Sequence, residues 1–206
     1  MSYIKFLGTA GARYVVAKQI RYSAGTYLNL KGENIILDPG PGTLVRCAKS
    51  RPPIDITKLD GIILTHSHID HSNDVNILID AMTEGGFKKR GGLFAPKECL
   101  EGSNAVVFNY LRDFPERIIT LKPSTGYNLG DLSFRTSIKH KHPVETYGVI
   151  FKLDDNKRLG FMVDTEFFPE LLKSYRECNI LVINVVRYKP HKSGKVMHLS
   201  VDDARK

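Results

Sequence analysis

One short stretch constrains this chain more than any other: residues 65–71 read THSHIDH. They follow directly on the apolar run 61–64, which is typical of a buried strand. Three imidazoles and a carboxylate are unfavourable packing groups, because burying polar groups costs free energy unless they are paired. The stretch therefore predicts a functional loop at the mouth of a buried strand.

Strands and helices alternate on both sides of this loop. Behind it, apolar residues at positions 75, 78, 79 and 82 have the spacing of one helix face, with Ser72 as the expected N-cap. The strands that we expect comprise residues 3–7, 22–30, 34–37, 61–64, 92–95, 132–138, 147–153, 158–163 and 179–186. The helices that we expect comprise residues 43–48, 75–82, 103–111 and 167–174. Together they predict an α/β fold with mixed sheets.

The composition indicates one hydrophobic core. A chain of 206 residues with 42% hydrophobic content can form a single domain over residues 1–206, and no boundary signal divides it. No long apolar run or secretory leader is readable, so we expect a cytoplasmic protein. Cys47, Cys99 and Cys178 are odd in number and far apart, which fits a reducing compartment. The formal charge of +8 weakly favours a polyanionic substrate.

The motif itself has the chemistry of a metal site. His66 and His68 are two apart in a segment that continues a strand, so both side chains can reach one ion. Asp70 and His71 come round the turn, where they can reach a second ion. Imidazoles with a carboxylate suit zinc, manganese or iron rather than calcium. A lone histidine is more often a hydrogen-bonded surface or core residue, but four such residues so close together favour metal.

The loop alone does not close a metal site, so further ligands must come from elsewhere in the chain. His142 follows the strand 132–138, and Pro143 enforces an extended turn just after it. Asp164 ends the apolar strand 158–163. Each has an alternative role, His142 in a solvated basic patch and Asp164 as the cap of a following helix. They are nevertheless the best-placed distal ligands.

Five segments together resemble the metallo-β-lactamase fold hydrolases. LTHSHIDH resembles the H-x-H-x-D-H signature of that family, and FLGTAGAR, IILDPGPG, HPVETYG and GFMVDT resemble its other landmarks in the same order. The resemblance covers nearly the whole chain and implies an αββα four-layer sandwich of two mixed β-sheets. It also implies two divalent metal ions, with zinc as the expected metal and manganese or iron as alternatives. The residues that would hold the ions are His66, His68 and His142 for the first, Asp70 and His71 for the second, and Asp164 for both.

The motifs are most similar to the small phosphodiesterase and transfer-RNA 3′-processing endonuclease branch. HPVETYG is similar to the third-histidine segment of that branch, whereas thioesterases and lactamases usually carry a TPGHT-like turn. Oxygen-reducing diiron members have a glutamate where this chain has His68, which argues against redox chemistry. The 22 positions from His142 to Asp164 are filled by two expected strands. They leave no room for the RNA-gripping arm of the processing endonucleases.

The last segment carries a further candidate. MHLSVDDA is similar to the segment that supplies a catalytic histidine outside the metal ligands in this branch, which gives that role to His198. Its residues also predict a helix start with Ser200 as cap. Family members usually continue to a final histidine that completes the second metal site, whereas this sequence stops at Lys206. We therefore expect a C-terminally truncated chain that lacks the last strand and helix.

The leading hypothesis is a metal-dependent phosphodiesterase that uses a hydroxide bridging two metal ions. In this hypothesis Asp70 orients the hydroxide and His198 protonates the departing oxygen. The expected partner is a small-molecule or nucleotide phosphodiester, with nucleic acid as a further candidate and no membrane. Basic runs at residues 88–90 and 187–195 are compatible with an anionic substrate.

Two alternatives stay open at this point. One is a thioester or lactone hydrolase of the same fold, in which only the pocket differs. The other is a non-catalytic metal-binding protein that associates with nucleic acid. The resemblance also implies a homodimer, although no sequence feature marks an interface.

Overall fold

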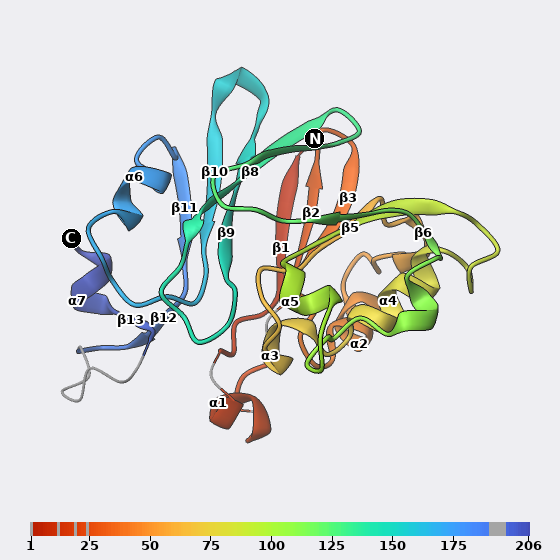
Figure 1. The fold of residues 1–206 in the computed structure, drawn as a ribbon, viewed down its shortest axis with the longest axis horizontal. Coiled ribbons are helices and arrows are strands. Elements are labelled where there is room, and N and C mark those ends of the chain that lie inside the picture. The colour runs from red at the N-terminus through yellow and green to blue at the C-terminus, as the bar shows by residue number, and fades with distance from the viewer. Residues whose placement is uncertain (1, 12, 19, 24, 190–196) are drawn as a thin grey trace.

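Two facing β-sheets form the centre of the computed structural model, which describes the whole chain except residues 1, 12, 19, 24 and 190–196 (Figure 1). The strands of the first sheet, in spatial order, are β1 (Tyr3–Gly8), β2 (Gly25–Leu30), β3 (Glu33–Leu37), β4 (Gly61–Ile63), β5 (Arg90–Ala95) and β6 (Pro115–Thr120). Neighbours from β1 to β3 are antiparallel, whereas those from β3 to β6 are parallel. The carboxyl ends of β3, β4 and β5 therefore meet at one edge of the sheet.

The second sheet is mostly antiparallel. Its strands, in spatial order, are β11 (Ile180–Ile183), β10 (Arg158–Met162), β9 (Tyr147–Lys152), β8 (Leu132–Lys139) and β7 (Gly126–Leu129). Among the described strands of this sheet, β10 and β11 pair in parallel and the other neighbours are antiparallel. A short parallel pair, β12 (Val185–Arg187) with β13 (Leu199–Ser200), follows it.

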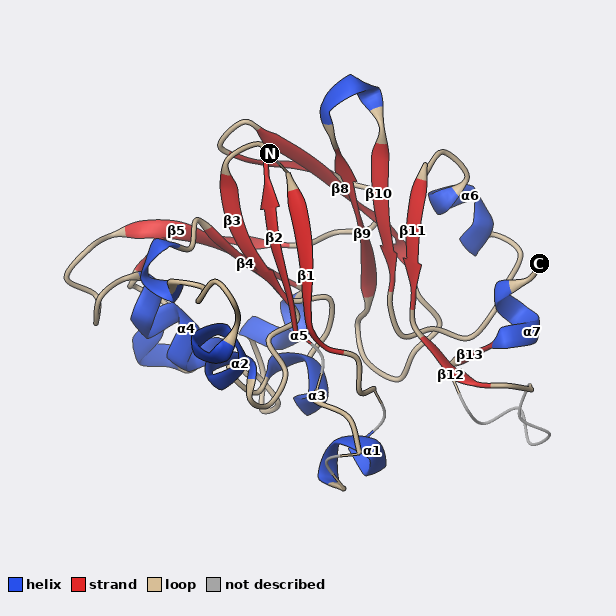
Figure 2. Ribbon diagram, turned by 180° about the vertical axis from the view of Figure 1, so that it is seen from behind, coloured by secondary structure: helices blue, strands red, loops and turns tan. Residues whose placement is uncertain are grey.

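Helices cover the outer faces of both sheets (Figures 1 and 2). The α-helices are α1 (Arg13–Ala17), α2 (Thr43–Lys49), α3 (Ile69–Ser72), α4 (Val75–Met82), α5 (Lys97–Leu100), α6 (Leu171–Tyr175) and α7 (Val201–Ala204). The 3₁₀ helices are η1 (Ile56–Lys58), η2 (Asn109–Leu111) and η3 (Asp154–Asn156). Because α2, α4 and α5 lie outside the first sheet and α6 and α7 outside the second, the layers are helix, sheet, sheet and helix, as predicted.

One hydrophobic core lies between the two sheets. In β3, Ile35 and Leu37 point into this core, whereas Ile36 points to the core beneath the helices. All three are buried, because the first sheet is covered on both faces. Phe94 of the first sheet meets Phe134 of the second edge to face, with ring centroids 5.1 Å apart. This packing fixes the position of one sheet against the other.

The helix predicted over residues 103–111 is wrong. Only η2 forms there, at its end. The backbone N–H groups of Val106 and Val107 instead donate to the carbonyl of Cys99, at 3.0 and 3.2 Å. Gly102, Ser103 and Asn104 precede them, and such residues favour turns over helices.

Other differences concern element ends and irregular strands. The sequence does not predict β6, which begins with Pro115, a residue tolerated only at such strand starts and sheet edges. The helix α6 begins at Leu171 rather than at residue 167, because Pro169 disfavours helix at the residue before it. None of the helices among the described residues is long and apolar enough to cross a membrane.

Candidate metal centre

The THSHIDH segment lies where β4 ends, as predicted. Its first residue, Thr65, is held by Asp38 at the end of β3, whose carboxylate accepts from the Thr65 backbone N–H and hydroxyl, both at 2.7 Å. The segment then turns into α3, which carries Asp70 and His71. The predicted cap role of Ser72 is wrong: its hydroxyl donates to carbonyls within the turn, and α4 starts after Asp74.

The second sheet supplies the distal residues. His142 lies in the connection from β8 to β9, Asp164 follows β10, and His198 precedes β13. A backbone bond joins the two halves, because the N–H of Tyr147 at the start of β9 donates to the Thr65 carbonyl at 3.1 Å. Residues from both sheets therefore converge on one volume.

One group consists of His66, His68, His142 and Asp164, whose ligand atoms all lie within 4.8 Å of one another. Nε2 of His142 is 3.0 Å from Nδ1 of His68, and Asp164 Oδ2 is 3.8 Å from Nε2 of both His66 and His142. Ligands of a tetrahedral zinc ion are about 3.3 Å apart. The group that the sequence predicts for the first metal thus has suitable spacing.

The residues predicted for the second metal adjoin this group. Nε2 of His71 lies 3.8 Å from Asp70 Oδ2 and 3.7 Å from Asp164 Oδ2. A second set of possible ligands contains Asp38, His66 and His71. Asp38 already accepts three hydrogen bonds, one of them from His71 Nδ1 at 2.9 Å. We therefore assign it a supporting position rather than a ligand position.

Hydrogen bonds fix which nitrogen of each ring faces the centre. The Thr65 hydroxyl donates to Asp38, so it accepts from Nδ1 of His66, at 3.0 Å. Nδ1 of His71 donates to Asp38, and Nδ1 of His142 donates to the Met197 carbonyl at 3.2 Å. In each case the Nε2 lone pair is directed to the centre, which is the arrangement that metal-binding histidines need.

Several buried nitrogens in the centre make no hydrogen bond to any residue that the structure describes. Among the described residues, Nε2 of His66, Nε2 of His71 and Nδ1 of His198 are buried without a hydrogen bond. Buried polar atoms of native proteins are nearly always paired, so such orphans need an explanation. A divalent cation explains them, because imidazole nitrogens and a carboxylate are the donors that zinc prefers.

The electrostatics agree with a cation. Burial lowers the pKa of His66 well below its usual range and that of His142 to about 4, so both rings stay neutral and can bind metal. Burial also lowers the pKa of His71, but the nearby carboxylates of Asp38 and Asp164 outweigh it and raise that pKa to about 9. The field that favours a proton on His71 equally favours a metal ion.

The His198 side chain is more open to solvent than those of His66, His71 and His142. It is 21% exposed, and Nδ1 lies 3.6 Å from Asp164 Oδ2. The segment also starts a helix, as the residues predict: Ser200 and Asp203 form a capping box at the start of α7. Both interpretations of this segment are therefore compatible with the structure, and the catalytic role stays a prediction.

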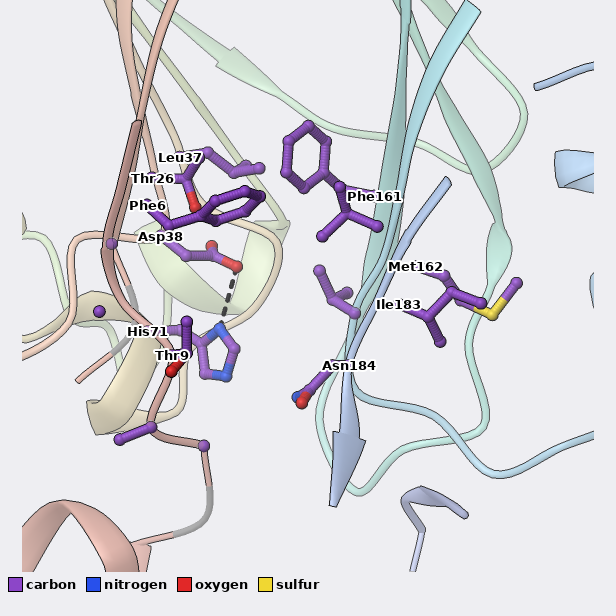
Figure 3. Close-up of a pocket in the computed structure, with 16 residues that line it drawn as sticks. Phe6, Thr9, Thr26, Leu37, Asp38, His71, Phe161, Met162, Ile183 and Asn184 are labelled. Atoms are coloured by element: carbon purple, nitrogen blue, oxygen red, sulfur yellow. Dashed lines mark hydrogen bonds and ion pairs between the residues drawn. The ribbon is translucent and has the colours of Figure 1, made fainter. Parts of the chain in front are cut away.

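Two supporting residues were missed at the level of sequence. Asp38 sits in IILDPGPG with a positive φ of 51°, and its place at a strand end before Pro-Gly was the available signal. Asn184 follows β11, and its side-chain amide donates to Asp164 Oδ1. Figure 3 shows Asp38 and His71 on one side of a small pocket and Asn184 on the other. No local pattern distinguishes Asn184 from a loop residue.

A family model described as a beta-lactamase superfamily domain matches residues 33–206. The chain belongs to this superfamily. The superfamily resemblance inferred from the five motifs is therefore confirmed, and with it the predicted metallo-β-lactamase fold. At this level the chain is a superfamily hydrolase whose histidine and aspartate clusters could hold divalent metal ions.

Two relatives are similar to this chain over most of its length. It is 31% identical over 206 residues to the uncharacterised protein MJ1374 of Methanocaldococcus jannaschii, covering 98% of this chain and 75% of that protein. It is 28% identical over 178 residues to ribonuclease Z of Thermococcus kodakarensis, covering 85% of this chain and 52% of that enzyme. The chain thus spans three quarters of the first relative and about half of the second.

Solved structures of the superfamily have the same fold. The metallo-β-lactamase fold protein YhfI of Bacillus subtilis superposes with a TM-score of 0.74 at 17% identity, over 97% of this chain and 77% of that one. The short form of human tRNase Z gives 0.72 at 15% identity, over 100% and 86%. A diphosphatase from the PhnP family gives 0.70 at 20% identity, over 99% and 81%.

Proposed function

We propose that this chain is a metal-dependent phosphodiesterase. The observation that carries the proposal is the convergence of imidazoles from both sheets, with Nε2 of His66, His71 and His142 aimed at one carboxylate oxygen of Asp164. Hydrogen bonds behind the rings hold these nitrogens in place. Such preorganised donors suit a dinuclear hydrolytic site. The relatives named ribonuclease Z and the PhnP-family diphosphatase support phosphate-ester chemistry.

We assign the metal positions as follows. His66, His68 and His142 would hold one ion, Asp70 and His71 the other, and Asp164 both. Zinc is the metal that this donor set favours, since three imidazoles and a carboxylate match its tetrahedral sites. Bound divalent ions would lower the pKa of a bound water to near neutrality and would neutralise negative charge on a phosphoryl oxygen.

The protein residues then have separate tasks. Asp164, held at Oδ1 by Asn184, keeps Oδ2 fixed at the centre. Asp70 is buried beside His71 and orients the attacking water through its carboxylate. The His198 side chain is partly exposed, so it can reach the departing oxygen and protonate it.

A second candidate is hydrolysis of a thioester or lactone by the same residues. The observation in its favour is the pocket of about 170 Å³ beside His71. Apolar side chains from both sheets line most of it, including Phe6, Leu37 and Phe161. An acyl chain would fit such a lining better than a charged phosphate would.

The test compares two generic substrates, a nitrophenyl phosphodiester and an acyl thioester, at equal zinc or manganese loading. We expect turnover of the phosphodiester and at least a hundredfold loss in His68→Ala. Preferential turnover of the thioester would select the second candidate. Turnover of neither above the His68→Ala background, in a chain that still binds metal, would refute the proposed function in favour of a binding role.

A further inference from the structure

A groove of about 580 Å³ lies at the edge of the first sheet, outside the metal centre. It is lined by residues 6–9 at the end of β1, by residues 20–22, and by Arg46 of α2; we call it the β1 groove. Its base is rigid, because the backbone N–H groups of Thr9 and Ala10 both donate to the Tyr22 carbonyl, at 3.0 and 2.7 Å. Gly8 permits this approach, since a Cβ there would collide with the carbonyl oxygens of Tyr22 and Ser23.

An arginine and a tyrosine are prearranged in the β1 groove. The guanidinium of Arg46 stacks on the ring of Tyr22, 3.5 Å from its centroid, and Nε of Arg46 donates to the Leu7 carbonyl at 3.3 Å. The stacking and this bond fix the plane of the guanidinium and leave its two terminal nitrogens for another acceptor. Tyr22 nevertheless keeps 55% of its surface exposed. The groove thus presents a guanidinium stacked on a partly exposed aromatic ring.

The charge of the β1 groove is not balanced by acids. No aspartate or glutamate occurs in residues 1–32. In the described part of the chain the arginines that form ion pairs are Arg90, Arg158 and Arg205, and neither Arg21 nor Arg46 is among them. Two such cations beside an open aromatic ring have the chemistry that binds a phosphate and a base together.

The β1 groove leads to the metal centre. Phe6, Gly8 and Thr9 line both the groove and the pocket that His71 lines, so the two hollows meet at the end of β1. α1, which follows this strand end, lies against α3, the helix that carries His71 (Figure 2). A chain that passes along the groove would therefore arrive beside the candidate metal ligands.

We propose that the β1 groove binds a nucleotide of a single-stranded nucleic acid next to the phosphate that is cleaved. Arg21 and Arg46 hold the backbone phosphate, and the ring of Tyr22 stacks on the base. This inference rests on the proposed phosphodiesterase function and narrows its substrate from any phosphodiester to an oligonucleotide. RNA and DNA share the phosphate and base chemistry on which the inference is based.

The first experiment measures binding without turnover. The chain, freed of metal with a chelator, is titrated against fluorescein-labelled oligouridylate and oligothymidylate of equal length, and the anisotropy is followed at several salt concentrations. We expect the double variant Arg21→Ala/Arg46→Ala to bind about tenfold more weakly, with a salt slope smaller by about 0.7 for each phosphate that is no longer neutralised. Tyr22→Phe should bind like the unmodified chain, and Tyr22→Ala several-fold more weakly.

A matched control removes the same charge elsewhere. Lys88→Ala/Lys89→Ala also deletes two exposed cations, and we expect it to retain binding within about twofold. Equal losses in the two double variants, or no loss in the arginine variant, would overturn the proposal. If Arg46→Ala reduces folding, the single variant Arg21→Glu at an exposed position serves instead, with the same expected direction. If the chain binds oligouridylate but not oligothymidylate, the ligand of the groove is RNA.

A second measurement separates this proposal from the proposed function. With metal restored, Arg21→Ala/Arg46→Ala should raise KM for the oligonucleotide by a larger factor than KM for the small nitrophenyl phosphodiester. Suppose that the unmodified chain binds oligonucleotide through these arginines but hydrolyses neither substrate. That result would refute the proposed phosphodiesterase function and support nucleotide binding in the β1 groove. If the small diester is cleaved and the arginines do not affect oligonucleotide binding, nucleotide binding in the β1 groove is refuted and the proposed phosphodiesterase function is supported.

Discussion

Asp164 is the residue on which both proposed metal positions depend. Its Oδ2 lies between 3.6 and 3.8 Å from a nitrogen of each of four histidines, His66 and His71 of the THSHIDH segment and His142 and His198 from two other segments. Its other oxygen is occupied by Asn184, whose own backbone N–H is fixed to the Met162 carbonyl at 2.9 Å. The burial of this carboxylate raises its pKa, but the surrounding histidines outweigh burial and lower it. Asp164 is therefore an anion held in one orientation.

We predict that Asn184→Leu lowers metal affinity by about 10- to 100-fold, because the side chain that orients Asp164 is removed while its volume is kept. Competition with a chromophoric chelator measures this affinity, and the metal-free unfolding temperature should change little. Asn179→Leu, at the opposite end of β11, is the control, since Asn179 bonds to the Arg158 backbone far from the centre. Equal affinities in the two variants would contradict a positioning role.

A pH prediction concerns the free thiol of Cys47 in the core beneath the helices. Burial raises the pKa of this thiol to about 11. The unfolded chain releases the proton at lower pH than the folded one, so the free energy of unfolding should fall as pH rises from about 9 to about 11. Cys47 alone should contribute about 1.4 kcal/mol per pH unit to the slope, in addition to the contributions of Cys99 and Cys178, whose pKa values burial also raises. Denaturant titrations measure it, and an unchanged slope in Cys47→Ala would contradict this origin.

At the scale of elements, the sequence predicted those helices and strands in which apolar residues recur at a regular spacing. The helix over 75–82 and the strand that ends before His142 are regular apolar patterns, and both form. The predicted site residues also converge, because their motif is local and their distal partners end regular strands. The supporting roles of Asp38 and Asn184 were not predicted, because each side chain binds residues that are far away in sequence and belong to another element. The helix predicted at 103–111 does not form, because hydrogen bonds from Val106 and Val107 to the Cys99 carbonyl, just before that range, fix the backbone in another conformation.

The packing of α6 on the second sheet makes an element-level prediction. Gly148 of β9 has no room for a side chain: a Cβ would meet the Tyr175 hydroxyl and the Phe161 carbonyl. Tyr175 in turn bonds to His140 Nε2 at 2.9 Å, behind Asp164. We expect Gly148→Ala to lower the free energy of unfolding by about 1–3 kcal/mol, as overpacking does. Urea titration measures this.

The control for this change is Gly126→Ala in β7, where no atom lies within 4 Å of the added Cβ. It should alter stability by less than about 0.5 kcal/mol. If both alanines cost the same, strand propensity rather than contact with Tyr175 would be the cause.

At the scale of the whole molecule, the metal centre joins the two sheets. Thr65 and its neighbours belong to the first sheet and His142 and Asp164 to the second, so a bound ion would link them. We predict that zinc at a free concentration of about 100 times Kd raises the free energy of unfolding by about 2.7 kcal/mol. For a chain of this size the unfolding temperature should rise by roughly 5–10 °C. Differential scanning calorimetry measures the shift.

His68→Ala supplies the control for that prediction, because it removes one ligand nitrogen from a partly buried position. The zinc-induced shift should shrink to a small fraction of its value, and a chelator should abolish it in the unmodified chain. A shift of equal size in the variant would place the stabilising ion elsewhere.

The hydrogen bond from Tyr147 to the Thr65 carbonyl has a kinetic consequence. It connects chain segments far apart in sequence, and contacts of this kind close late because loop-closure entropy opposes them. During refolding, each sheet can acquire its own ladder before the two dock, and only docking brings the histidines of one to the carboxylate of the other. Uptake of a coloured ion such as cobalt should therefore lag behind the recovery of the far-ultraviolet signal, so that it reports the last step of folding.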